Sequence, residues 1–293
     1  MVSLAESKGD FLLSPKECNL DISLCCGQAF RWEKNKENIW VGVVKNSIIY
    51  LRQNEKKVDW KIRTLNREEE QNTENIISQY LNLNLDVIMV QEKLSKDKIL
   101  KKILPLSKGL RILKQNPWET LISFMLSANN NIPRICGIIS NLCVTWGYHL
   151  DGPYFTFPLP ETLSITTDSE LRATGMGYRA PYILEAAQTI ASGKLNLEEL
   201  QNQNYEKARE TLIKLKGVGP KIADCTCLFG LGHLEAFPVD VWTKRILQWA
   251  YFESTPITDK KATEFGRKRF GDIAGYAQEH LFYYARNFML NEK

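Results

Sequence analysis

The sequence lacks several features that are typical of other classes of protein. No stretch of about 18 consecutive apolar residues is present, and we therefore expect no membrane-spanning helix. The first ten residues contain no apolar h-region, which argues against a signal peptide. None of the seven cysteines belongs to a C-x-x-C pair and none follows Cys227. We therefore expect reduced thiols in an intracellular chain, without disulfides and without a cysteine-ligated iron–sulfur cluster.

Strong charge of either sign is also missing. The chain has 38 basic and 34 acidic residues, which give a formal net charge of +4. This balance permits nucleic-acid binding but does not require it, because any affinity for DNA must come from a local basic patch. With 293 residues, 44% of them hydrophobic, the chain can bury a large core in one large or two ordinary domains.

Residues 1–105 have the composition of an α+β domain. Four short segments rich in β-branched and aromatic residues predict an antiparallel sheet: Gln28–Trp32, Ile39–Val44, Ser47–Arg52 and Val58–Arg63. Lys45 and Asn46 join the middle two segments in the manner of a tight hairpin. Helices are expected near Glu68–Leu81 and Asp86–Ile103.

Residues 106–293 are predicted to be mainly helical. The segment Asn116–Glu119 has Asn at an N-cap position, Pro at the first helical position and Glu at the third. The apolar run Thr120–Leu126 that follows is expected to cross the core. A further helix is expected to begin at Ile132, directly after three consecutive asparagines.

The stretch Tyr205–Leu231 has the pattern of two helices joined by a glycine turn. Gly217 and Gly219 permit positive φ, and Pro220 suits the first turn of the second helix. Such a helix-hairpin-helix presents free backbone N–H groups to an anion the size of a phosphate. The alternative is that the Gly-x-Gly turn is only a tight corner between two helices.

Two polar residues near this turn indicate chemistry on DNA. Lys221 opens the second helix, where the helix dipole and burial both favour the neutral, nucleophilic form of its amine. Asp240 directly precedes the helical run Val241–Ala250 and is placed to be its N-cap. An amine and a carboxylate beside a phosphate anchor suit attack on a sugar carbon of DNA.

The motif Leu-Lys-Gly-Val-Gly-Pro-Lys221, with Pro-Val-Asp240 further on, resembles the helix-hairpin-helix (HhH-GPD) DNA glycosylases. Other segments narrow the resemblance to the 8-oxoguanine DNA glycosylase/AP lyases, in family order from about Leu13 to Phe288. The resemblance implies an N-terminal TBP-like antiparallel sheet domain over residues 1–105 and a helical glycosylase domain over residues 106–293. It also implies that Lys221 attacks C1′ and forms a Schiff base, after which β-elimination cleaves the strand. Asp240 would stabilise charge on the sugar, assist proton transfer or cap its helix, and the sequence leaves these roles open.

The resemblance also implies a pocket for the damaged base. The stretch Cys25–Trp32 matches the family segment in which the carbonyl of the glycine at Gly27 accepts a hydrogen bond. Guanine N7 is an acceptor, whereas 8-oxoguanine carries a hydrogen there, so a fixed carbonyl favours the damaged base. Cys225 would form a wall of the pocket, Gln278 would bind the Watson–Crick edge, and Phe282 would stack on the ring. Each assignment has an ordinary structural alternative. Gly27 would be a turn glycine, Cys225 a small buried hydrophobic residue, and Gln278 and Phe282 an i,i+4 pair of the kind found in any amphipathic helix.

The remaining contacts that the family implies are with the DNA around the base. Asn129 would fill the hole that the flipped base leaves, and Arg134 would read the orphaned cytosine. Tyr178 and Arg179 would contact bases beside the lesion, although a solvated Arg next to a core Tyr is the commoner outcome for such a pair.

One position departs from the family pattern. Trp242 stands where the best-known members carry a histidine that contacts a phosphate. An indole offers an N–H group without a charge, and Lys244 and Arg245 are the nearby residues that offer compensating positive charge.

The expected partner is double-stranded DNA that contains 8-oxoguanine, preferably opposite cytosine, bound by a monomer. No cofactor, metal site or membrane association is expected, and whether carbonyls of the hairpin bind a cation is left open. The expected location is the cytoplasm or nucleoid, or the nucleus in a eukaryote. Two rival functions remain open. One is a glycosylase for alkylated bases, against which Lys221 argues because such enzymes typically lack that lysine. The other is a non-catalytic DNA-binding module whose hairpin only anchors a phosphate.

Overall fold

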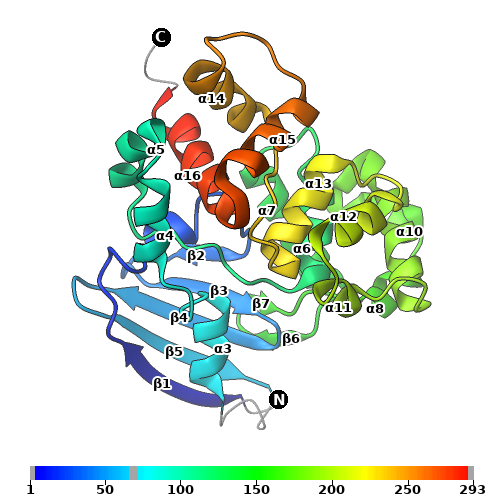
Figure 1. Ribbon diagram of the computed structural model, residues 1–293. Helices are drawn as coiled ribbons and strands as arrows, with labels where there is room; N and C mark the ends of the chain where they lie inside the picture. The colour runs from blue at the N-terminus through cyan, green and yellow to red at the C-terminus, as the bar shows by residue number, and fades with distance from the viewer. Residues whose placement is uncertain (1–3, 66–71, 290–293) are drawn as a thin grey trace.

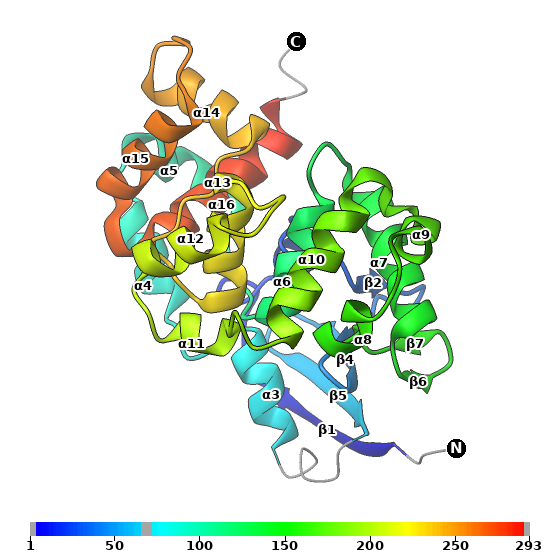
Figure 2. The ribbon, with the colours of Figure 1, turned by 90° about the vertical axis from the view of Figure 1, so that its right-hand side faces the viewer.

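A computed structural model describes residues 4–65 and 72–289 (Figure 1). The N-terminal part forms a five-stranded antiparallel sheet in the spatial order β1-β5-β4-β3-β2. Its strands are β1 (Ala5–Phe11), β2 (Trp32–Lys34), β3 (Trp40–Val44), β4 (Ser47–Gln53) and β5 (Val58–Thr64). Figure 2 shows this sheet toward the lower end of the molecule, with most of the helices above it. The predicted α+β class, with a sheet followed by a helical part, is confirmed.

One face of the sheet is buried, and side chains alternate between its two faces. In β5 every second residue from Val58 to Thr64 is buried, while the residues between them are only partly covered. The turn predicted at Lys45 and Asn46 is confirmed, because Val44 pairs with Ser47 and Lys45 has a φ of 52°. Helices α1 (Leu20–Ser23) and α3 (Thr73–Tyr80) supply apolar side chains to the core on the buried face of the sheet.

One prediction for the sheet was wrong, and one strand was missed. The strand expected at Gln28–Trp32 begins only at Trp32, because the buried amide of Gln28 is hydrogen-bonded to the backbone of Ser23, Arg111 and Leu113. Strand β1 was not predicted. It is an edge strand that pairs only with β5, and most of its residues are exposed, so it carries no apolar alternation.

The expected helix Asp86–Ile103 is two helices, α4 (Val87–Leu94) and α5 (Lys98–Ile103). Asp97 divides them, because its carboxylate caps α5 by accepting the N–H groups of Ile99 and Leu100 at 2.9 and 3.0 Å. The helix expected at Glu68–Leu81 is present as α3, and the part of that prediction at residues 68–71 lies outside the described residues.

The rest of the described chain is mainly helical and is interrupted by one small hairpin, β6 (His149–Asp151) and β7 (Tyr154–Phe155). Its helices are α6 (Pro117–Leu126), α7 (Ile132–Trp146), α8 (Pro160–Ser164), α9 (Asp168–Leu171), α10 (Ala180–Ala191), α11 (Leu197–Gln201), α12 (Tyr205–Ile213), α13 (Pro220–Cys225), α14 (Val241–Tyr251), α15 (Asp259–Phe270) and α16 (Ala274–Asn287). Short 3₁₀ turns lie at Leu104–Ser107, Gly177–Arg179 and Gly271–Ile273, and π-helical segments at Arg172–Met176 and Thr226–Leu231.

Helix α6 is the central helix that the sequence predicted. Asn116 caps it by accepting the N–H of Glu119 at 3.0 Å, and Pro117 occupies the first turn. Every residue from Thr120 to Leu126 is buried. The aromatic ring of Phe124 stacks on Phe229 with 5.4 Å between centroids, so α6 packs directly against the segment that follows α13.

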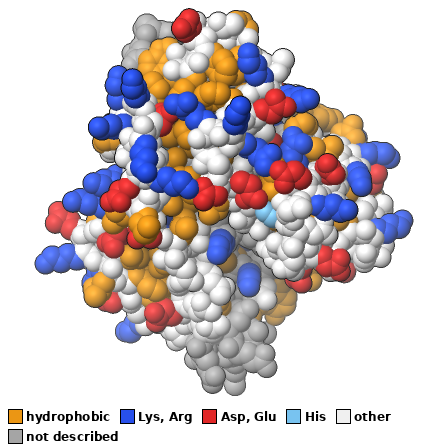
Figure 3. Space-filling view, viewed as in Figure 1, with side chains coloured by type: hydrophobic (Ala, Val, Ile, Leu, Met, Phe, Trp, Pro, Cys, Tyr) orange, Lys and Arg blue, Asp and Glu red, His pale blue; other side chains and the backbone are white. Residues whose placement is uncertain are grey.

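One large apolar cluster unites the helical part, and it includes side chains of α4 and α5 as well as α16. Both views show α5 and α16 side by side (Figures 1 and 2). The domain boundary at residue 105 stays a prediction. Basic and acidic side chains are interspersed over the face shown in Figure 3, in keeping with the small net charge. No helix in the described ranges is long and apolar enough to cross a membrane.

Candidate active site

The predicted helix-hairpin-helix is formed by α12, the glycine turn and α13. Gly217 has a φ of +80°, and a Cβ atom there would lie 2.8 Å from the Cβ of Tyr182, so both conformation and space require glycine. Gly219 is the N-cap residue of α13, and a Cβ atom added to it would meet no atom within 4 Å. The N-terminus of α13 therefore opens to the surface, as a phosphate anchor requires.

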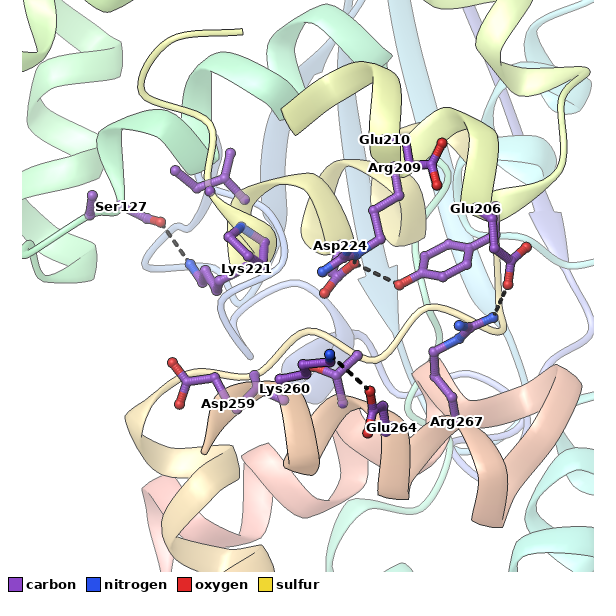
Figure 4. Close-up of a pocket in the computed structure, with 17 residues that line it drawn as sticks. Ser127, Glu206, Arg209, Glu210, Lys221, Asp224, Asp259, Lys260, Glu264 and Arg267 are labelled. Carbon is purple, nitrogen blue, oxygen red and sulfur yellow. Dashed lines mark hydrogen bonds and ion pairs between the residues drawn. The ribbon is translucent and has the colours of Figure 1, made fainter. Parts of the chain in front are cut away.

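A buried carboxylate fixes the two helices of the hairpin against each other. Asp224 on α13 is 1% exposed and accepts hydrogen bonds from Tyr205 Oη at 2.7 Å and Arg209 Nε at 2.6 Å, both on α12 (Figure 4). Burial raises the pKa of Asp224, and these two donors oppose that rise. Because Asp224 lies less than one turn from Lys221, this clamp also fixes the backbone that carries the lysine.

The Lys221 side chain is half-buried and lines a cleft. Its Nζ donates a hydrogen bond to Ser127 Oγ at 2.8 Å and lies 5.0 Å from the centroid of the Phe124 ring (Figure 4). Lys221 is at one end of a cleft of about 630 Å³ between the hairpin and α15. In the described part of the chain no ion pair within 4.0 Å joins Lys221 to Asp240.

Asp240 is the N-cap of α14, as predicted from the sequence. Its Oδ1 accepts the backbone N–H of Thr243 at 2.8 Å. The hydroxyl of Thr243 in turn accepts a hydrogen bond from Gln278 Nε2 at 3.1 Å. Two residues that the sequence assigned to different tasks, Asp240 and Gln278, are therefore linked through one threonine.

The structure brings the expected base-binding residues together from three parts of the chain. Gly27 has a φ of +103°, and a Cβ atom there would lie 3.6 Å from the ring of Phe282. Gln278 is 4% exposed, and its Oε1 has no hydrogen-bond partner among the described residues. Cys225 is buried, which raises the pKa of its thiol to about 12, and its electrostatic neighbours include Lys221 and Asp240. The roles of these residues stay predictions.

Glu279 is a buried acid in this region that the sequence analysis missed. It is 4% exposed, and the Cys26 thiol donates to its Oε2 at 3.5 Å. Burial raises its pKa to about 8. A sequence signal was available, because Glu279 lies four residues after Gly275 and three before Phe282, on one helix face.

The residues expected to contact DNA differ in how exposed they are. Asn129 follows α6 with a φ of +49° and is exposed, as is Arg134 in the first turn of α7. Tyr178 is 52% exposed, whereas Arg179 is 5% exposed. The Arg179 guanidinium donates to the carbonyl oxygens of Ala128, Met176 and Asn129 and lies 4.4 Å from the Tyr178 ring. Its contact with a base stays a prediction, since its donors are already paired in this structure.

The two cations near Trp242 also have partners. The Arg245 guanidinium lies 5.1 Å from the centroid of the Trp242 ring. Lys244 Nζ lies 2.7 Å from Asp259 Oδ1 in an exposed ion pair. Arg245 is therefore the cation that lies against Trp242, the residue that departs from the family pattern.

Comparison with known proteins identifies the family to which this chain belongs. The model of the 8-oxoguanine DNA glycosylase N-terminal domain matches residues 10–121, and the model of HhH-GPD superfamily base excision DNA repair proteins matches residues 122–271. The chain belongs to the 8-oxoguanine DNA glycosylase family of HhH-GPD proteins. The family resemblance that the sequence indicated is thereby confirmed.

Individual members are similar over most of their length. The N-glycosylase/DNA lyase of Saccharomyces cerevisiae is 34% identical and is aligned over 94% of this chain and 85% of its own. A probable N-glycosylase/DNA lyase of Methanothermobacter thermautotrophicus is 36% identical over 65% of this chain and 68% of its own. The Clostridium acetobutylicum 8-oxoguanine glycosylase/lyase, solved with DNA containing cytosine opposite 8-oxoguanine, has a TM-score of 0.89 and 34% identity, with full coverage of both chains.

In the described ranges no group of three or more His, Cys, Asp or Glu residues could hold a metal ion. The polar groups near Lys221 are instead a hydroxyl, buried or capping carboxyls and one amide. Such groups can position an amine and a leaving base and can move protons.

Proposed function

We propose that this protein is a bifunctional DNA glycosylase and AP lyase that removes 8-oxoguanine from duplex DNA, preferably opposite cytosine. The observation that carries the proposal is the half-buried Lys221 amine at the start of α13, hydrogen-bonded to Ser127, in a member of this family. Relatives named N-glycosylase/DNA lyase and the Clostridium acetobutylicum complex with 8-oxoguanine opposite cytosine support the same substrate and the same two activities.

The chemistry follows from a primary amine next to a flipped nucleotide. The damaged base cannot be reached inside the duplex and is rotated out of it. Lys221 Nζ forms a bond to C1′ while the bond from C1′ to N9 breaks, and the base leaves with that electron pair and takes up a proton. The sugar ring opens to a Schiff base, and loss of a C2′ proton then expels the 3′ phosphate. Asp240, which is linked to Gln278 through hydrogen bonds to Thr243, is suited to stabilise positive charge on the sugar and to move protons.

Recognition of the base rests on four residues. The Gly27 carbonyl would accept the N7 hydrogen that 8-oxoguanine has and guanine lacks. The buried Oε1 of Gln278, which has no hydrogen-bond partner among the described residues, can accept an N–H group of the Watson–Crick edge. Phe282 would stack on one side of the ring and Cys225 would close the other.

The DNA around the base is assigned to residues near α6 and the hairpin. Asn129 would fill the hole in the helix, with Arg134 and Tyr178 beside the opposite strand, and Arg179 would exchange its carbonyl partners for base edges. The N–H groups around Gly217 and Gly219 would hold a phosphate. We further propose that the protein acts inside the cell, as a monomer and without a cofactor.

Borohydride trapping on a duplex with 8-oxoguanine opposite cytosine tests the proposal. The wild-type protein is expected to form a covalent adduct, and Lys221→Gln is expected to form none while still binding the duplex. Lys194→Gln, which changes an exposed lysine in the α10–α11 connection, is the matched control and should trap normally. Undiminished trapping by Lys221→Gln would place the nucleophile elsewhere. Excision of alkylated bases alone, or binding without any excision, would support one of the two rival functions.

A further inference from the structure

The C-cap residue of α6 contacts the amine that the proposed reaction uses. Ser127 is the C-cap of α6, and its hydroxyl donates a hydrogen bond to the Phe124 carbonyl at 2.7 Å. A serine hydroxyl has a single hydrogen and two acceptor lone pairs. Toward Lys221, at 2.8 Å, the Ser127 oxygen can therefore act only as an acceptor (Figure 4).

This arrangement restricts a side chain that is otherwise very free. A lysine amine sits on a flexible four-carbon stem and can rotate its N–H groups. When one N–H is donated to Ser127, the remaining N–H bond and the lone pair of the neutral amine must point away from α6. The Phe124 ring, 5.0 Å from Nζ, closes a second side. The amine then presents its lone pair in a restricted direction, as attack on a sugar carbon requires.

Phe124 and Ser127, which contact the Lys221 amine, are fixed by contacts of their own. Phe124 is stacked on Phe229 and meets Phe30 edge to face, with centroids 5.4 and 5.6 Å apart, so its ring cannot swing away. The carbonyl of Ala128, the residue after Ser127, accepts from Arg179 Nε at 3.1 Å. Ser127 is thus fixed from α6 on one side and from the buried Arg179 on the other.

We propose that Ser127 is a positioning residue for this reaction, whose hydroxyl orients the Lys221 amine toward C1′. The inference rests on the proposed function, because it assigns Ser127 a role only if Lys221 is the nucleophile. The alternative is that Ser127 merely ends α6 through its bond to Phe124. The chain offers a matched control for that alternative, since Ser95 ends α4 with the same kind of bond, to the Glu92 carbonyl at 2.7 Å.

Three variants separate positioning from capping: Ser127→Ala, Ser127→Thr and Ser95→Ala. We expect Ser127→Ala to slow single-turnover excision and borohydride trapping by about tenfold or more, with the duplex Kd within about twofold of wild type. Ser127→Thr keeps an acceptor oxygen at the same position and should recover most of both rates. Ser95→Ala should leave excision, trapping and Kd unchanged.

A preformed abasic site makes the test sharper, because trapping there needs the amine but no base release. The inference predicts the same loss in Ser127→Ala and the same recovery in Ser127→Thr on that substrate. Wild-type rates in Ser127→Ala would overturn it. A proportional loss of thermal stability, DNA binding and rate without recovery by threonine would also overturn it. If Lys221→Gln traps normally, the proposed function itself has failed; if only Lys221→Gln is inactive, the role of Ser127 alone has failed.

Discussion

The buried carboxyl of Glu279 makes the stability of this protein depend on pH in a predictable direction. Burial raises its pKa from 4.5 to about 8, and the negative charge of Asp240 adds to the rise. The Cys26 thiol, which donates a hydrogen bond, and the more distant Arg286 both lower the pKa without cancelling the effect of burial. Within the described residues Glu279 forms no ion pair. We therefore expect its carboxyl group to be protonated in the folded protein at neutral pH.

The direction in which the free energy of unfolding changes with pH follows from the protonation of Glu279 in the folded and unfolded chains. The unfolded chain releases this proton near pH 4.5, whereas the folded chain keeps it to about pH 8. Between these two values the folded state binds more protons, and the free energy of unfolding falls as the pH rises, by at most about 1.4 kcal/mol per pH unit. Over three pH units the loss that Glu279 causes is therefore at most about 4 kcal/mol.

The perturbation that isolates this effect is Glu279→Gln, which keeps the shape and removes the proton. The substitution also changes the free energy of unfolding by an amount that does not depend on pH. This amount cancels when the same variant is measured at several pH values. We expect the free energy of unfolding of the variant, relative to wild type, to rise by about 2–4 kcal/mol from pH 5 to pH 8. The buried Asp224 and the half-buried Glu119, whose pKa values desolvation also raises, affect wild type and variant alike.

Urea unfolding at pH 5, 6.5 and 8, with linear extrapolation to water, measures the difference. Glu92→Gln, which changes an exposed glutamate of α4 that is in no ion pair with any described residue, is the control and should show no such slope. If the curves for wild type and Glu279→Gln run parallel across this range, Glu279 ionises normally and the reasoning from its burial is refuted.

Three further predictions concern the active site and the hairpin. Asp240→Asn keeps a good N-cap for α14 and should fold normally, yet slow single-turnover excision by about 10²-fold or more if the carboxylate acts in the reaction; near-normal rates would remove it from the mechanism. Arg134→Ala should reduce the preference for cytosine opposite the lesion, measured as relative excision opposite the four bases; equal excision opposite all four by the wild type would contradict this role. Gly217→Ala should lower the free energy of unfolding by about 1–3 kcal/mol, because of its positive φ and its contact with Tyr182. Gly219→Ala, in open space with an ordinary φ, is its control in thermal unfolding, and equal losses would show that the contact with Tyr182 is unimportant.

Short-range features of the molecule were predictable from the sequence. Asn116 and Asp240 were recognised as helix caps because a capping side chain bonds to the backbone only three residues away. The glycine turn at Gly217 was recognised because positive φ is a property of the residue itself. The error at Gln28 has distant partners as its cause: Gln28 is hydrogen-bonded to backbone 83 and 85 residues away and therefore does not lie in a strand.

By itself, then, the sequence determined the class of fold, the hairpin, the caps and the family whose chemistry Lys221 and Asp240 are expected to perform. Only the tertiary structure decided what surrounds those residues. The hydroxyl that holds the Lys221 amine is 94 residues away in the chain, and Gly27 meets Phe282 across nearly the whole of it. The burial that keeps Glu279 protonated likewise comes from packing among segments far apart in sequence. Helix periodicity and capping are set by neighbours along the backbone, whereas hydrogen bonds and desolvation at a site depend on which distant segments pack together.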